Sequence, residues 1–315
     1  MEDPTQTLEK RSFPLRHTLI SFLADLDVKG VRRIAHHLPR LLIPDPGEAC
    51  IMKTLHGFWL QIDPARDQGL DRSIYYTGTY EKGTLAVMKN LLSDGDIFVD
   101  AGANIGLMSI YASRLVGSSG RVFAFEPHPE TAEILEENIR LNGCKNISVS
   151  RQAVGKEPGR AKIYNRWDSP RGRASLIPPG DSSESHEVSV TTLSEYLISH
   201  QKDIREISMV KLDIEGYELE ALMGAGRLLE KENAPMLIVE CSEKRENAQG
   251  SSPEDLYSFL MELGHYRIFR GRKDKGRTSR LVEVSSTRNL PRHDNIYCFT
   301  KRHLEKIPRR IIATV

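Results

Sequence analysis

The feature that most constrains this chain is a regular alternation of strand-like and helix-like segments that begins at residue 97. The apolar runs of strand type are 97–100, 121–126, 147–154, 209–213 and 236–240, and the amphipathic runs of helix type are 105–115, 129–141, 217–231 and 253–263. Such alternation is typical of a parallel sheet with helices on both faces. Two late strands, at 266–269 and 296–300, should pair antiparallel. We therefore predict an α/β fold with a doubly wound, mostly parallel sheet and an antiparallel C-terminal hairpin.

The first quarter of the chain follows a different pattern. Apolar residues at helical spacing run through 15–43, with expected breaks at Gly30 and Pro39, and the segments 50–54 and 58–62 are expected to form a hairpin. We predict an α+β N-terminal extension at 1–80 and a larger domain at 81–315. Packing over the ligand crevice, self-association and contact with a membrane surface all stay open as roles for the extension.

Composition narrows the classes of function. Lys and Arg number 44 against 43 Asp and Glu, which argues against a chain held to nucleic acid by a global basic field. A basic run at 267–280 leaves RNA binding open as an alternative. No apolar stretch approaches the ~18 residues of a spanning helix, and the acidic N-terminus does not resemble a secretory signal. The four cysteines are scattered, with no zinc or disulfide pattern, so we expect a reducing, cytoplasmic location.

A glycine-rich turn joins the first predicted strand to the first predicted helix. It reads Asp100-Ala-Gly102-Ala-Asn104-Ile-Gly106, and glycines are needed where a backbone turns tightly against a ligand. Nicotinamide, flavin, phosphate and adenosyl ligands all use such turns, so the turn alone does not identify the ligand. The GxxxG spacing lacks the third glycine of the dinucleotide fingerprint and disfavours a nicotinamide cofactor.

Carboxylates follow the predicted strands and should gather at one edge of the sheet, where open α/β folds bind ligands. These acids are Asp100, Glu126, Asp213, Glu215, Glu218 and Glu240. An acidic opening repels a pyrophosphate and attracts a cation, and S-adenosylmethionine carries a sulfonium and an ammonium but no phosphate. Glu126 ends the second strand, where an acid can accept hydrogen bonds from both ribose hydroxyls. The acids therefore favour S-adenosylmethionine over a nicotinamide dinucleotide.

The chain resembles the FkbM family of class I, S-adenosylmethionine-dependent methyltransferases. The resemblance lies in FVDAGANIGLMSIYAS (98–113), FAFEPHPET (123–131), the Asn138 region of ENIRLNG (137–143), RQAVG (151–155) and VKLDIEGYELEALMGA (210–225). It implies a Rossmann-like sheet and O-methylation of sugars or natural products. It also implies that Asp100, Gly102, Asn104 and Gly106 hold the methionine end of the cofactor and Glu126 the ribose, with Gln152 and Ala153 beside the adenine. Asp213 would lie next to the same cofactor.

Methyl transfer to a hydroxyl calls for a general base near the methyl group. Our hypothesis is that Asp213, with Glu215 close by, is that base or orients the acceptor. The alternatives are that both acids bind cofactor or cap the following helix, or that they hold a divalent metal together with Glu240.

Oxygen is the expected acceptor atom, because Leu-Asp-Ile-Glu stands where amino-methyltransferases carry Asn-Pro-Pro-Tyr. A small molecule or glycan is the expected acceptor, and the segment 165–186 is a candidate substrate lid. A nicotinamide-dependent oxidoreductase and a non-catalytic descendant that binds a partner through the extension remain as alternatives.

Overall fold

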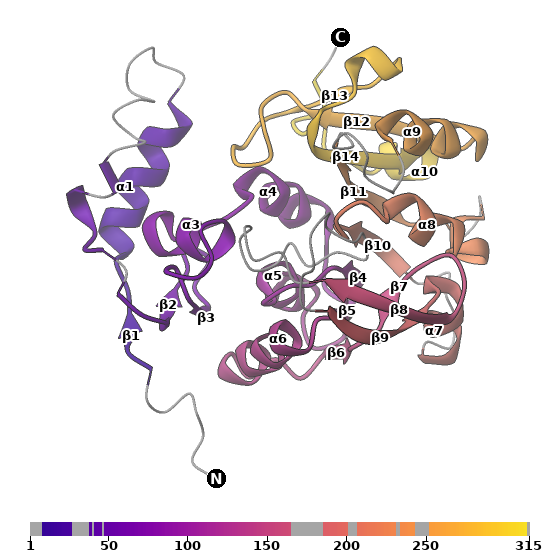
Figure 1. The fold of residues 1–315 in the computed structure, drawn as a ribbon. Helices are drawn as coiled ribbons and strands as arrows, with labels where there is room; N and C mark the ends of the chain where they lie inside the picture. The colour runs from indigo at the N-terminus through magenta and orange to yellow at the C-terminus, as the bar shows by residue number, and fades with distance from the viewer. Residues whose placement is uncertain are drawn as a thin grey trace.

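The computed structural model describes residues 8–26, 38–39, 41–45, 47–164, 185–200, 207–230, 234–242 and 252–313. Its centre is an eight-stranded sheet in the order β13-β12-β14-β11-β10-β4-β5-β6 (Figure 1). The bounds are β4 Ile97–Ala101, β5 Arg121–Phe125, β6 Ile147–Ser150, β10 Ile207–Leu212, β11 Met236–Ser242, β12 Tyr266–Gly271, β13 Leu281–Glu283 and β14 His293–Thr300. The strands from β11 to β6 pair parallel, whereas β14 pairs antiparallel with both β11 and β12. The predicted fold class and the antiparallel pairing of the two late strands are confirmed.

Helices cover both faces of this sheet, and the alternation of side chains along each strand decides which core a residue joins. In β4, Phe98 packs into the cluster on the side of α5 and α6, whereas Val99 packs into the opposite cluster with residues of α7, α8 and α9. The helices are α4 Lys82–Leu91, α5 Leu107–Val116, α6 Pro129–Leu141, α7 Leu193–His200, α8 Glu218–Met223, α9 Pro253–Glu262 and α10 Lys301–Leu304, with short 3₁₀ turns at Gly226–Leu229 and Thr287–Asn289. A two-sided core of this kind requires the nearly continuous apolar strands seen in the sequence.

The strand order reverses at β4, and this reversal positions the ligand site. After β4 the chain moves to β5 and β6 on one side, and it later returns to β10 and β11 on the other. Open α/β sheets bind ligands at such a switch point, beyond the carboxyl ends of the strands. The backbone closes here, since Gly102 N–H donates to Phe125 O at 3.0 Å and Asp213 N–H donates to Ala101 O at 3.0 Å. The glycine turn and the Asp213 loop therefore lie side by side.

The N-terminal extension forms its own small sheet, with β1 Lys10–Arg11, β2 Cys50–Lys53 and β3 Trp59–Ile62, beside α1 Pro14–Asp25 and α3 Leu70–Thr77 (Figure 1). The predicted hairpin is confirmed as the antiparallel β2–β3 pair. The extension is fastened to α6 by Asn138, whose Oδ1 accepts from Gln61 N–H at 2.6 Å, and by Asn142, whose Oδ1 accepts from Trp59 N–H at 2.9 Å. Its apolar side chains join the same hydrophobic cluster as α4 and α5.

A third sheet was missed by the sequence pattern. The predicted strand 147–154 divides into β6 and β7 Ala153–Val154, and β7 leaves the central sheet to pair with β9 Ser185–Thr191, which in turn pairs with β8 Gly159–Tyr164. The order of this sheet is β7-β9-β8. The candidate lid at 165–186 connects β8 to β9, and its residues 165–184 lie outside the described residues.

The predicted helix 217–231 is also shorter than expected. Helix α8 ends at Met223. The next residue, Gly224, packs directly on the backbone of Gly155, and a Cβ on Gly224 would lie 2.1 Å from the Gly155 carbonyl oxygen. All four cysteines are free, and Cys50, Cys241 and Cys298 are buried, as their scattered positions predict. In the described part of the chain, no helix is both long enough and apolar enough to cross a bilayer.

Candidate active site

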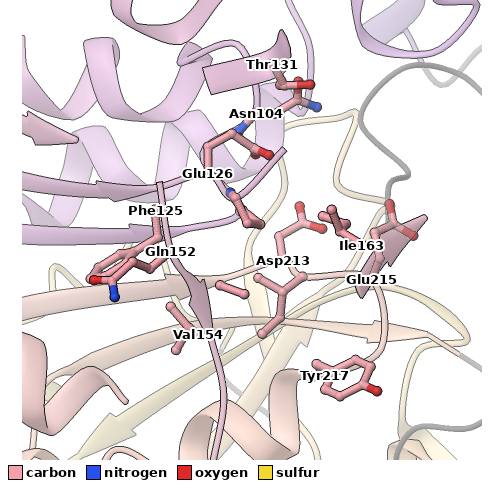
Figure 2. Close-up of a pocket in the computed structure, with 14 residues that line it drawn as sticks. Asn104, Phe125, Glu126, Thr131, Gln152, Val154, Ile163, Asp213, Glu215 and Tyr217 are labelled. Carbon is pink, nitrogen blue, oxygen red and sulfur yellow. The ribbon is translucent and has the colours of Figure 1, made fainter. Parts of the chain in front are cut away.

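A pocket lies beyond the carboxyl ends of β4, β5 and β10 (Figure 2). Its lining residues are Gly102, Asn104, Phe125, Glu126, Pro127, Thr131, Gln152, Ala153, Val154, Ile163, Asp213, Ile214, Glu215 and Tyr217. Six of the residues named from the sequence as cofactor ligands line this pocket: Gly102, Asn104, Glu126, Gln152, Ala153 and Asp213. Asp100 and Gly106 do not line it.

Two positions of the glycine turn, Gly102 and Gly106, have no room for a side chain. Gly102 has φ +84°, and a Cβ there would lie 1.9 Å from the carbonyl oxygen of Asp213. Gly106 has φ +96° and precedes α5, where a Cβ would lie 2.7 Å from Leu135 Cδ1. Gly102 therefore lets the turn approach the Asp213 loop, whereas Gly106 serves the packing of α5 against α6.

The Glu126 carboxylate, directly after the end of β5, is oriented by two backbone hydrogen bonds. Its Oε2 accepts from Asn104 N–H at 2.9 Å and its Oε1 accepts from His128 N–H at 3.0 Å. Burial raises the pKa of Glu126 to about 7, even though both hydrogen bonds favour the ionised form. The backbone thus fixes the orientation of the carboxylate, and each oxygen keeps a lone pair for a ligand hydroxyl.

Asp213 follows β10 and points into the pocket above a buried cation. Its Oδ2 lies 2.8 Å from Lys211 Nζ, and the Lys211 side chain is only 4% exposed against 21% for Asp213. Burial alone would raise the pKa of Asp213, but the ammonium groups of Lys211 and Lys275 hold it well below its usual range. Asp213 is therefore ionised at neutral pH.

Asp100 lies beneath the turn rather than in the pocket. It is fully buried, its Oδ2 accepts from Ser109 Oγ at 2.6 Å, and its Oδ1 has no hydrogen-bond partner among the described residues. Burial raises the pKa of Asp100 despite the nearby Lys211. Asp100 therefore supports the turn from beneath rather than facing the ligand.

Glu215 and Glu218 have separate positions, although the sequence placed both at the opening. Glu215 lines the pocket from a strained left-handed backbone, with φ 55°. Glu218 instead turns beneath the loop, where its Oε1 accepts from Ile214 N–H at 2.9 Å and its Oε2 from Gly216 N–H at 3.1 Å. Burial raises the pKa of Glu218 to about 7. The expectation that Glu218 lines the crevice is wrong, because its carboxylate caps the backbone of the loop.

One end of the pocket is largely apolar. Phe125 and Val154 lie there beside Gln152, in a slot that suits a flat heterocycle with polar edges, whereas Ile163 lies near Asp213 and Glu215 (Figure 2). Ile163, Val154 and Tyr217 were not found by sequence reasoning. The first two come from β8 and β7, whose separate sheet the pattern did not reveal. Val154 lies within RQAVG (151–155), but only Gln152 and Ala153 of that motif were given a role.

Backbone strain concentrates at this site. Among the described residues, the non-glycine positions with positive φ are Glu81 at 46°, Asn104 at 50° and Glu215 at 55°. Such conformations cost of order 1–3 kcal/mol each and persist where the surrounding structure over-determines them, often at functional sites. Asn104 and Glu215 both line the pocket.

Asp213, Glu215 and Glu240 each offer a carboxylate oxygen within 4.8 Å of the other two, which is the metal alternative raised from the sequence. Two of these acids already contact ammonium groups, since Glu240 Oε1 lies 2.9 Å from Lys275 Nζ and Asp213 Oδ2 lies 2.8 Å from Lys211 Nζ. The lysines supply the positive charge that a metal would supply. We therefore assign no metal to this cluster.

The donor set of the pocket fits S-adenosylmethionine. An oriented carboxylate, Glu126, suits the ribose hydroxyls, and the apolar slot beside Gln152 suits the adenine. The ionised Asp213 and the Glu215 side chain lie at the other end, where the cationic part of that molecule is stabilised by negative charge.

Comparison with known proteins agrees with this geometry. The model of a family described as "Methyltransferase FkbM domain" matches residues 100–268. Methyltransferase 1 of Beauveria bassiana is 26% identical over 148 residues, which cover 42% of this chain and 59% of that protein. Hexuronic acid methyltransferase AglP of Haloferax volcanii is 28% identical over 190 residues, which cover 58% of this chain and 68% of that protein.

Among solved structures, the chain is similar to an S-adenosylmethionine-dependent O-methyltransferase from Thermotoga maritima. The match covers 81% of this chain and 93% of that one, at 15% identity and a TM-score of 0.40. The chain spans about 59% of the length of its first curated relative, so the activity of that whole protein is not transferred to it. The family model covers more than half of the described fold and contains the glycine turn, Glu126 and Asp213. The chain belongs to the FkbM family of S-adenosylmethionine-dependent methyltransferases.

Proposed function

We propose that this chain is an O-methyltransferase that moves a methyl group from S-adenosylmethionine to a hydroxyl of a sugar, natural product or other small molecule. The observation that carries the proposal is the position of Asp213, an ionised carboxylate at the pocket surface with a buried lysine behind it. Family membership excludes the nicotinamide-dependent oxidoreductase considered from the sequence.

We propose the following roles for the residues that line the pocket. Glu126 binds the ribose hydroxyls, Gln152 and Ala153 border the adenine, and the turn at Gly102 and Asn104 cradles the methionine end. These contacts fix the direction of the donor, and such alignment supplies much of the acceleration in a displacement reaction. S-adenosylmethionine, when bound, supplies an electrophilic methyl group.

Asp213 would orient the acceptor and take its proton. Its low pKa makes it a weak base toward a resting hydroxyl. The hydroxyl becomes far more acidic, however, as its oxygen bonds to the methyl carbon, because positive charge develops on that oxygen. A weak base within hydrogen-bond reach is then sufficient. Glu215, at the same end of the pocket, would hold a second polar group of the acceptor.

Two observations support oxygen as the acceptor atom. The loop after β10 reads Asp213-Ile-Glu215-Gly, which provides carboxylates where an amino-methyltransferase provides carbonyls and an aromatic ring for a planar amine. One relative is a hexuronic acid methyltransferase, which makes acidic sugars a rational first choice of acceptor.

The test is calorimetry with S-adenosylhomocysteine, followed by methyl transfer to a panel of neutral sugars, uronic acids, phenols and amines. We expect binding of S-adenosylhomocysteine and a methylated product that survives mild alkali, as an ether does and a methyl ester does not. Asp213→Asn should lower transfer about 10²–10⁴-fold. Glu220→Gln, a change on helix α8, which follows the Asp213 loop, but outside this pocket, should not lower it. A methylated amine or an alkali-labile ester as the main product would refute the proposal.

A further inference from the structure

A buried chain of charges continues from Asp213 away from the pocket and into parts of the chain that lie outside the matched family domain. Lys275 Nζ lies 2.9 Å from Glu240 Oε1 and 2.8 Å from Glu81 Oε1. The Glu81 side chain is only 3% exposed, and those of Glu240 and Lys275 are 13% and 19% exposed. Glu81 comes before the family match at 100–268 and Lys275 comes after it.

The fold brings these distant residues together through backbone contacts. Lys275 belongs to the connection between β12 and β13, which reaches the start of α4 (Figure 1). There Gly83 N–H donates to Lys275 O at 2.9 Å, and a Cβ on Gly83 would lie only 2.6 Å from Arg277 O. The connection is therefore docked, and Lys275 points inward although it lies in a run of basic residues that the sequence presents as a solvated loop.

Glu81 is held as firmly as Lys275. It has a left-handed backbone, with φ 46°, and its Oε2 accepts from Asn295 Nδ2 at 3.0 Å. Asn295 also donates to Thr84 Oγ1 at 2.9 Å. Replacing a buried ion pair with apolar groups is often neutral or stabilising, so a strained and buried pair of this kind is poorly explained by stability alone.

The charges around Lys275 show what it does. Burial would lower the pKa of Lys275, but Glu81, Asp213 and Glu240 together raise it, so the ammonium stays charged. The negative charge of Asp213, together with burial, raises the pKa of Glu240 well above its usual range, which favours a protonated Glu240 that donates a hydrogen bond to Asp213, whose carboxylate lies within 4.8 Å. Lys275 Nζ contacts Oε1 of Glu240, which leaves Oε2 for a contact with Asp213. Asp213 thereby receives one hydrogen bond from Glu240 and one from Lys211.

We propose that Lys275, anchored by Glu81, is a positioning residue of the methyl-transfer site, which fixes Glu240 beside Asp213 so that Asp213 presents a set lone pair to the acceptor hydroxyl. This inference rests on the proposed function. In the step it serves, the acceptor oxygen bonds to the methyl carbon, the carbon–sulfur bond breaks with its electron pair going to sulfur, and the hydroxyl proton passes to Asp213. Lys275 itself touches no reacting atom.

The main test compares Lys275→Met with Arg272→Met, which removes the same charge from an exposed position in the same connection. With an acceptor identified by the screen above, we expect Lys275→Met to lower kcat about a hundredfold, as misplacement by about 1 Å does. The KM for S-adenosylmethionine and the Kd for S-adenosylhomocysteine should not change. Arg272→Met should behave as wild type. A wild-type kcat in Lys275→Met would overturn the proposal.

A double variant separates positioning from simple stability. Lys275→Met leaves Glu81 buried without its cation, so the melting temperature should fall, and Glu81→Gln with Lys275→Met should restore it, because both charges are then gone. We expect kcat to stay low in the double variant. Recovery of kcat together with the melting temperature would show that Lys275 has only a structural role.

An infrared measurement on the protein without acceptor distinguishes failure of this inference from failure of the proposed function. The protonated carboxyl band that Glu240→Gln removes should shift in Lys275→Met and not in Arg272→Met. If wild-type protein methylates no hydroxyl but the band still shifts in Lys275→Met, the proposed function fails and the positioning of Glu240 stands. An unshifted band overturns the positioning.

Discussion

Replacement of Gly102 by alanine tests the geometry on which the cofactor site depends. An alanine at φ +84° costs about 1–2 kcal/mol, because its Cβ crowds the following carbonyl. The added Cβ would also lie 1.9 Å from Asp213 O, about 1.5 Å inside ordinary van der Waals contact. Asp213 O is a backbone atom and the Cβ is fixed to the Gly102 backbone, so relief of the clash requires a backbone shift. Forcing such an overpacked contact costs typically 1–3 kcal/mol. We expect Gly102→Ala to lower the free energy of unfolding by about 2–5 kcal/mol.

Gly143→Ala is the matched control. Gly143 also has positive φ, at +64°, but a Cβ there would meet nothing within 4 Å, so only the conformational cost of about 1–2 kcal/mol remains. Urea unfolding measures both variants, and calorimetry with S-adenosylhomocysteine measures the site. Gly102→Ala should weaken binding at least about tenfold, equivalent to ~1.4 kcal/mol, because the turn must move away from the Asp213 loop. Equal losses of stability in the two variants, with binding intact in Gly102→Ala, would refute the close approach of turn and loop.

Three further outcomes follow from single side chains. Asp213→Asn should lower methyl transfer about 10²–10⁴-fold while S-adenosylhomocysteine still binds, as followed by turnover and calorimetry. Burial raises the pKa of Glu126 from 4.5 to about 7. The contribution of Glu126 to the free energy of unfolding is therefore fully present below pH 4.5 and is lost as pH rises to 7. Glu126→Gln should flatten that part of the pH profile of stability measured by urea unfolding. Asn138→Leu should cost about 2–3 kcal/mol of unfolding free energy, because the buried amide joins β3 to Ile105 O, and a smaller loss in urea unfolding would contradict this.

The sequence predicted the central sheet well because its signals are local. Each buried parallel strand is a continuous apolar run, and a single acid or glycine marks its end, as at Asp100 and Glu126. The hairpin at β2 and β3 and the helix Pro129–Leu141 were found for the same reason. Strand β7 was not separated from β6, because only two residues divide them and both segments are apolar enough for one strand.

The site was predicted in part, and the misses share a cause. The turn at Gly102 and the acid Glu126 lie beside the strands that present them, so sequence spacing places them correctly. Sequence spacing does not predict which way a carboxylate side chain points. Glu218 turns back and caps the backbone of its own loop, and Asp100 is buried beneath the glycine turn. Lys275 contacts Glu240 from 35 positions away, through a connection whose composition is that of an ordinary solvated loop.

The structure also changes the electrostatic reasoning that selected the methyl donor. A count of acids at strand ends treats all of them as equally charged. Lys211, which is buried, and Lys275, which is partly buried, neutralise much of that charge, and the pKa of Glu240 is raised. The negative charge left facing the pocket belongs to Asp213 and Glu215. Lys211 and Lys275 reduce the total negative charge at this edge of the sheet. The same two cations keep Asp213 ionised, so the remaining negative charge is concentrated on that carboxylate. Preference for a sulfonium donor should therefore depend on Asp213 more than on the total number of acids, and removing Glu218 should affect the loop's stability before it affects the choice of ligand.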